Sequence, residues 1–151
     1  MTRALIDTNL LVLMLVGASH PDWIGNRKPV GNFAPTDFDY LVSSLEGVGG
    51  FLTTPHILTE TSNLLGIPKR SSATSALVST FVKFVEKSVE IPVSSREIVS
   101  VSAFLRFGLT DTGIMMMRAE RAKILTVDFA LFGKLSELGM NVENIRHQTK
   151  L

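Results

Sequence analysis

Four acidic side chains, Asp7, Glu60, Asp111 and Asp128, stand at positions from which they can do hydrolytic chemistry. Asp7 and Asp128 each directly follow a short apolar run, and the other two lie in segments typical of helices. Carboxylate oxygens are the ligands that hard cations such as Mg²⁺ and Mn²⁺ prefer. Two such ions about 3.5–4 Å apart can activate water and stabilise the leaving oxygen of a phosphodiester. The four acids therefore predict a carboxylate cluster that binds Mg²⁺ or Mn²⁺.

Each acid also has an ordinary structural explanation. Asp7 and Asp128 can cap the helices expected after them, and Asp111 can favour the first turn of its helix through the helix dipole. Glu60 can be a solvated surface residue. Taken singly, these explanations compete well with a functional one, but a cap at Asp128 is compatible with metal binding.

The elements that must position these acids alternate along the chain. Short apolar runs predict strands and longer periodic segments predict helices. The strands are expected at 4–6, 51–53, 89–93, 124–127 and 142–145, and the helices at 10–15, 36–46, 55–65, 72–87, 94–107, 111–122 and 129–138, with a loop over 17–35. This alternation predicts one α/β domain over residues 1–151, with a central parallel sheet between two helical layers. A capping box is expected at Ser94, and Thr110 is expected to cap the helix that follows it.

Two strand ends should bring Asp7 and Asp128 to one edge, because ligands of parallel sheets bind beyond the carboxyl ends of the strands. Asp111 falls on the apolar face of its predicted helix, so it should point inward. Glu60 lies at the flank of the apolar stripe on its helix, with Asn63 one turn on beside it. The spacing places Glu60 less firmly than the other acids.

Composition limits the alternatives. The formal net charge is +1, so nucleic acid would have to bind a local patch rather than a global basic field. The absence of cysteine excludes zinc–thiolate sites and thiol nucleophiles and fits a cytoplasmic protein. The apolar run over 10–16 is too short to span a bilayer, so no membrane association is expected, although the N-terminus superficially resembles a signal peptide. A mean hydropathy of +0.27 suggests apolar surface covered by a partner or a second copy.

Basic residues offer weaker candidates for contact with phosphate. Arg118 falls near the side of Asp111 on the predicted helix, but a charge at the rim is the simpler interpretation. The pairs Arg27-Lys28 and Lys69-Arg70 lie in expected loops and can touch an RNA backbone or simply be solvated.

Four short motifs resemble those of PIN domains, in the same order. They are Leu5-Ile6-Asp7-Thr8-Asn9-Leu10-Leu11, Leu58-Thr59-Glu60-Thr61-Ser62-Asn63-Leu64, Gly108-Leu109-Thr110-Asp111-Thr112 and Leu125-Thr126-Val127-Asp128-Phe129. The resemblance implies a three-layer α/β/α fold and Mg²⁺- or Mn²⁺-dependent cleavage of RNA. It makes Asp7, Glu60, Asp111 and Asp128 the catalytic metal ligands, supported by Thr8, Asn9 and Thr126. Val127 and Ala130 stand where some relatives carry further acids, which leaves one or two metals open.

The same resemblance implies possible partners. Many PIN-domain proteins of the VapC type are toxins paired with a protein antitoxin, and they commonly form homodimers. The segment 17–35 is longer than a minimal toxin of this kind would carry, which favours the general nuclease role over the toxin role. Two other functions stay open: a catalytically inactive PIN-like module for binding or assembly, and a phosphatase or flap-type DNA nuclease that uses the same metals.

Overall fold

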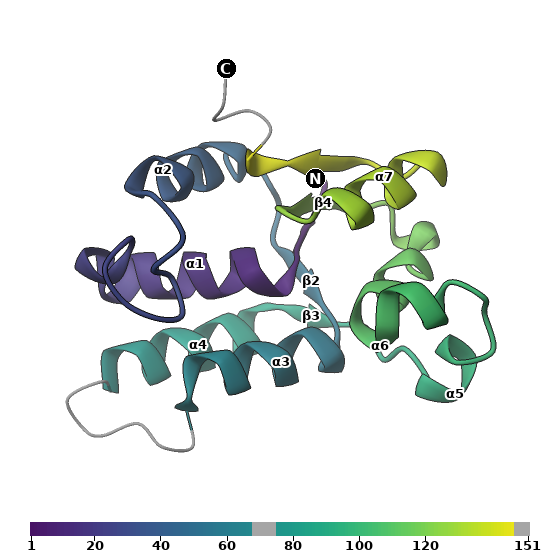
Figure 1. The fold of residues 1–151 in the computed structure, drawn as a ribbon, viewed down its shortest axis with the longest axis horizontal. Helices are drawn as coiled ribbons and strands as arrows, with labels where there is room; N and C mark the ends of the chain where they lie inside the picture. The colour runs from purple at the N-terminus through teal and green to yellow at the C-terminus, as the bar shows by residue number, and fades with distance from the viewer. Residues whose placement is uncertain (68–74, 147–151) are drawn as a thin grey trace.

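Five short strands form one parallel sheet, and the computed structural model describes it within residues 1–67 and 75–146 (Figure 1). The strands are β1 (Ala4–Ile6), β2 (Phe51–Thr53), β3 (Val89–Glu90), β4 (Lys123–Thr126) and β5 (Val142–Asn144). Their order across the sheet is β3-β2-β1-β4-β5. All five were predicted from apolar runs, with boundaries that differ by a few residues at most.

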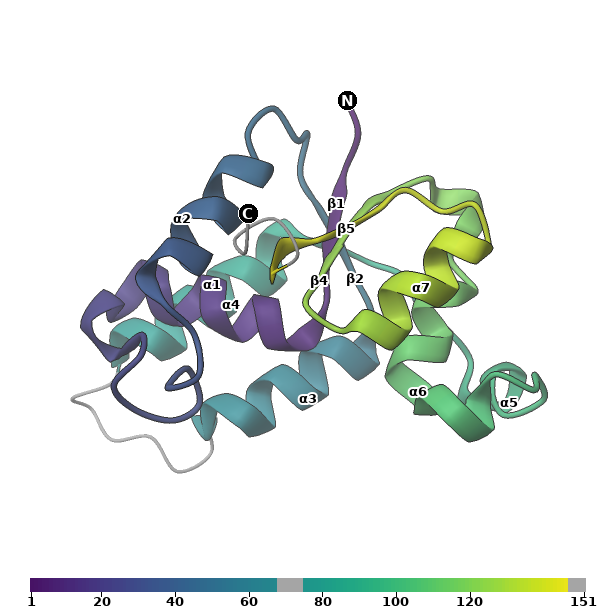
Figure 2. The same ribbon diagram turned by 45° about the horizontal axis from the view of Figure 1, so that its top comes forward.

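Helices cover both faces of the sheet, which confirms the predicted α/β/α layers. They are α1 (Thr8–Ser19), α2 (Pro35–Ser44), α3 (Pro55–Leu65), α4 (Ser75–Lys87), α5 (Ser95–Ile98), α6 (Phe104–Met115) and α7 (Phe129–Glu137), with 3₁₀ turns η1 (Pro21–Trp23) and η4 (Arg118–Glu120). In Figure 2, α1, α2 and α4 lie on one side of the strands, and α6 and α7 lie on the other. Helix α3 packs against α1.

Helix α1 is the central helix of its layer. Its residues from Leu10 to Val16 are almost all buried, because α2, α3, α4 and η1 surround the side that does not face the sheet. A helix that is apolar all round has to be buried in this way. The helix continues to Ser19, and η1 follows, so the prediction of a short helix and an irregular loop over 17–35 was wrong at these positions.

The predicted helices over 94–107 and 111–122 were wrong in their extent. Helix α5 ends at Ile98, and α6 begins at Phe104 and ends at Met115. Gly108 interrupts α6 with a φ of 77°, a conformation that glycine adopts without the steric cost of a β-carbon. This kink separates the segment carrying Asp111 from the first turn of α6. Ser94 makes no side-chain capping hydrogen bond.

Two expectations fall outside the described residues: the start of the helix predicted at Ser72 and the basic pair Lys69-Arg70. Within the ranges that are described, none of the helices combines the length and the hydrophobicity that crossing a lipid bilayer requires.

The sheet changes its direction of growth between β1 and β4. From β1 the chain adds β2 and then β3 on one side, and it later returns to place β4 on the other side of β1. Such a switch point leaves a crevice beyond the carboxyl ends of the two strands, where α/β proteins bind their ligands. Asp7 follows β1 and Asp128 follows β4, so the topology brings both acids to this edge of the sheet.

The close approach of α1 and α2 gives a test of the packing. A β-carbon at Gly17 would overlap the ring of Phe38, so we expect Gly17→Ala to lower the free energy of unfolding by about 1–3 kcal/mol. Gly133, in α7, has no neighbour that a β-carbon would meet, and Gly133→Ala should raise stability by about 0.5–1 kcal/mol. Urea unfolding of both variants measures the contrast. Equal effects at the two glycines would contradict the α1–α2 contact.

Candidate active site

A hydroxyl group links the ends of the two central strands. The Thr126 Oγ1 atom donates a hydrogen bond to Asp7 Oδ2 at 2.8 Å and accepts one from the Asp128 backbone N–H at 3.0 Å. Thr126 is fully buried at the end of β4. The predicted convergence of Asp7 and Asp128 at one edge of the sheet is confirmed, and Thr126 supports them directly.

Asp7 is a buried carboxyl group, with 5% of its surface exposed. It caps α1 by accepting a hydrogen bond from the Thr8 N–H at 2.7 Å. Burial raises the pKa of Asp7, and the hydrogen bonds from Thr126 and Thr8 oppose this effect. The charges of Asp128 and Glu60 raise the pKa further. Asp7 therefore both caps α1 and belongs to the acidic cluster.

Asp111 faces the same group of acids from α6. It is partly buried, and burial is the largest cause that raises its pKa to about 7. The charges of Asp7, Asp128 and Glu60 raise it further, in that order. The inward direction predicted for Asp111 holds, although the helix that positions it ends at Met115 instead of continuing to residue 122.

Glu60 and Asp128 are exposed at the rim of the cluster. Glu60 accepts a hydrogen bond from the Thr110 hydroxyl, which ties α3 to α6. Asp128 caps α7 by accepting from the Leu131 N–H at 2.9 Å. The sequence predicted a cap for Thr110, so its contact with Glu60 was missed; its position directly before Asp111 was the available signal.

The predicted supporting residues divide into two groups. The Thr8 hydroxyl is buried beside Asp7 and finds no hydrogen-bond partner among the described residues, and Asn9 is exposed in a hollow that Asp128 also lines. Asn63 is different. It is exposed on α3 and lines another hollow with Lys28 and Pro29, so the structure does not join it to the four acids.

A polar hollow of about 280 Å³ opens beside Asp128. Asn9 and Asn32 line it together with Arg146, whose guanidinium donates to the Asn32 carbonyl at 2.8 Å. The same guanidinium lies over the Phe33 ring, 4.7 Å from its centre. No sequence motif surrounds Arg146, and only the fold brings this cation to the acidic edge.

The donor atoms of this edge suit a hard divalent cation. All are oxygens, neighbouring carboxylates raise the pKa values of Asp7 and Asp111, and the buried Thr8 hydroxyl has an unused hydrogen-bonding capacity. However, within residues 1–67 and 75–146 no three acidic or histidine side chains are already grouped as metal ligands. The chemistry of these oxygen ligands therefore fits a cation. The carboxylates, however, lie farther apart than the ligands of a closed metal site.

Comparison with known proteins adds no assignment. No protein-family model matches this chain, and no curated protein matches it. The resemblance to PIN domains therefore depends on the four short motifs and on the α/β/α architecture, which many unrelated proteins share.

The acidic cluster predicts an unusual dependence of stability on pH. The pKa of Asp111 is raised to about 7 from 3.8, so the unfolded chain ionises this group at lower pH than the folded one does. Stability is therefore lost as the pH rises from about 4 to 7, and the loss is complete above that range. In the presence of a chelator, we expect Asp111→Asn to raise the melting temperature more at pH 8 than at pH 5.

Calorimetry of wild type and variant at several pH values measures this difference. Asp39→Asn is the matched control, because Asp39 is exposed on α2 away from the cluster. If Asp111→Asn raised the melting temperature equally at pH 5 and pH 8, the ionisation of Asp111 would not be what destabilises the folded chain.

Proposed function

We propose that this protein is a PIN-like, Mg²⁺- or Mn²⁺-dependent endoribonuclease. The observation that carries the proposal is the gathering of Asp7, Asp111 and Asp128 at the switch point of the sheet, where their charges act on one another. Carboxyl groups with perturbed pKa values in a crevice are candidates for a functional site. The choice of RNA as the substrate follows from the resemblance of the motifs.

The carboxylates have separate tasks in this proposal. Asp7 is fixed by two hydrogen bonds, so it would hold a cation in one defined position. Asp111 and Asp128 would bind from α6 and from the start of α7. When bound, Mg²⁺ or Mn²⁺ supplies an activated water and neutralises charge on the scissile phosphate. Mg²⁺ often keeps several waters and takes only one or two carboxylates directly, which is compatible with this loosely grouped set.

Glu60 would act at the rim, held by the Thr110 hydroxyl. Its exposure leaves it free to orient a water or to complete a second cation position, so one or two metals stay open. Asn9, Asn32 and Arg146 line the hollow beside Asp128 and would contact the RNA strand next to the cleaved bond. Arg146 would supply the positive charge that a phosphate needs near four acids.

A toxin role belongs to the same proposal at a finer level. The exposed apolar side chains of Leu105 on α6 and Phe129 on α7 support a protein partner, either an antitoxin or a second copy in a homodimer. A small antitoxin gene next to the gene for this protein would support the toxin role, which the nuclease activity does not require.

Two alternatives share the fold. An inactive PIN-like module for binding or assembly would bind no Mn²⁺ and cleave nothing, and the intact set of four acids argues against it. A phosphatase or flap-type DNA nuclease would use the same metals on another substrate. Parallel assays on RNA, DNA and small phosphoesters distinguish these activities.

The direct test is RNA cleavage by the wild type and Asp7→Asn. With Mn²⁺ or Mg²⁺ present, we expect the substitution to reduce the cleavage rate on the order of a hundredfold or more, because it removes a fixed charge from the site. A chelator should abolish wild-type cleavage. The substitution keeps the shape of the buried side chain, so circular dichroism should show a folded variant.

Asp39→Asn again serves as the control and should cleave like the wild type. Cleavage by Asp7→Asn at the wild-type rate would refute the carboxylate site as the source of the activity, and a wild type that cleaves no RNA with either metal would refute the nuclease proposal. Metal-dependent cleavage of DNA but not RNA would support the proposed metal site and show that DNA, not RNA, is the substrate.

A further inference from the structure

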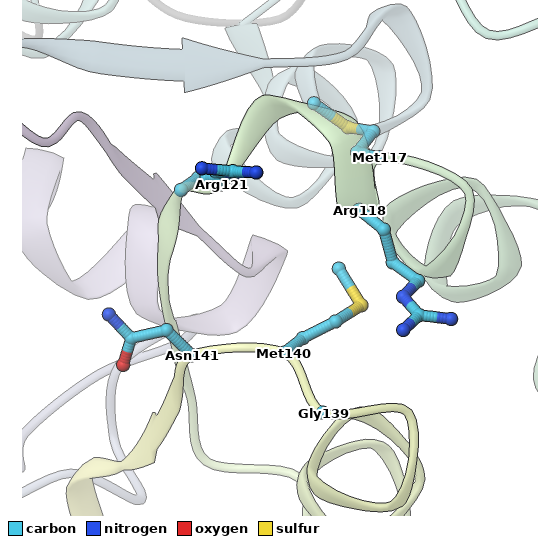
Figure 3. A pocket seen from close by; sticks show the side chains of 7 residues that line it. Met117, Arg118, Arg121, Gly139, Met140 and Asn141 are labelled. Atoms are coloured by element: carbon cyan, nitrogen blue, oxygen red, sulfur yellow. The ribbon is translucent and has the colours of Figure 1, made fainter.

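A second polar hollow lies at the opposite edge of the sheet, before β4 and β5 begin. Figure 3 shows the residues that line its volume of about 280 Å³: Met117, Arg118, Arg121, Ala122, Gly139, Met140 and Asn141. Arg121 and Ala122 lead into β4, whereas Asp128 follows that strand. The hollow is therefore separated from the carboxylate cluster by the length of the sheet.

Two arginines give this hollow its charge. Arg118 and Arg121 are both exposed, and neither guanidinium makes a hydrogen bond or an ion pair within the part of the chain that the structure describes. Arg121 also lines an adjoining hollow with Arg3 and Glu120, which extends the basic edge. The chain as a whole has a formal net charge of only +1, so this is a local concentration of positive charge.

The backbone at Arg121 is a second, independent sign of function. Its φ of 51° places it in the left-handed region, and within the described residues it is the one non-glycine residue with a positive φ. Glycine would adopt this conformation at the end of η4 without strain. A strained residue retained where glycine fits better points to a use for its side chain.

Methionines provide the apolar part of the hollow. In Figure 3 the Met140 side chain rises into the space beside Arg118, and the Asn141 amide points away from it. Met117 is buried at the far wall. Thioether side chains adapt their shape to flat ligands, and guanidinium groups bind phosphate through paired hydrogen bonds.

We propose that this hollow binds a phosphate group, with Arg118 and Arg121 as its ligands and Met140 against the remainder of a ligand of nucleotide size. The volume is at the lower end of small-molecule pockets, which are on the order of 300 Å³ and larger. The phosphate can come from a free mononucleotide or from an RNA strand. The site does not depend on the carboxylate cluster or on nuclease activity.

The test is an NMR titration of the full chain at low salt with inorganic phosphate, adenosine monophosphate and a 5′-phosphorylated RNA oligonucleotide. We expect the amide signals of Ala122, Gly139 and Asn141 to shift. Arg118→Gln and Arg121→Gly should each weaken binding about tenfold, the equivalent of about 1.4 kcal/mol. Arg121→Gly should melt at or above the wild-type temperature, which separates loss of charge from loss of folding.

Arg96→Gln is the matched control, because Arg96 is exposed on α5 and should leave the affinity unchanged. Binding of adenosine monophosphate would identify a nucleotide as the source of the phosphate, and binding of the oligonucleotide alone would identify RNA. Either result supports the site if both Arg118 and Arg121 are needed for the binding. The proposal would be overturned if none of the three probes caused shifts, if Arg118→Gln and Arg121→Gly bound as well as the wild type, or if Arg96→Gln lost as much affinity as they do.

Discussion

The hydrogen bonds of the Thr126 hydroxyl connect the two strands on either side of the switch point. This one group fixes a carboxylate oxygen of Asp7 and the backbone of Asp128, and thus sets the spacing of the acids that follow β1 and β4. The rest of the edge is built around that pair. Helix α6 brings Asp111 toward them, and Thr110 ties Glu60 on α3 to α6. A buried Asp7 without Thr126 would lose the partner that lowers the cost of its charge.

Gathering four acids at one edge opposes stability unless a positive charge joins them. Burial and repulsion raise the pKa of Asp7 and of Asp111, so the folded chain holds protons there that the unfolded chain releases. Carboxyl groups with such perturbed pKa values cluster at functional sites. The arginines at the other edge leave the two ends of the sheet with opposite charge, which is compatible with a cation at one end and an anion at the other.

The sequence predicted the sheet well because its strands are short apolar runs between clear turn signals. It predicted Asp7 and Asp128 for the same reason: each directly follows such a run. Near Asp111, the predicted break between two helices at 108–110 agrees with the kink at Gly108, but the helix that carries Asp111 ends at Met115 instead of residue 122. Contacts between distant segments, such as Thr110 with Glu60 or Arg146 beside Asp128, leave no local pattern that could be recognised. Arg118 was expected beside Asp111 on one helix. Because α6 ends at Met115, Arg118 lies at the opposite edge of the sheet instead.

The proposed function requires a divalent cation to bind among the carboxylates at the switch point. Paramagnetic broadening of amide signals by substoichiometric Mn²⁺ measures where the ion resides. The proposed metal site predicts strong broadening at residues 7–9, 110–112 and 126–129, and loss of this broadening when excess Mg²⁺ competes. Broadening centred on other acids, such as Glu143 beside Lys123, or no broadening at the switch point, would contradict it.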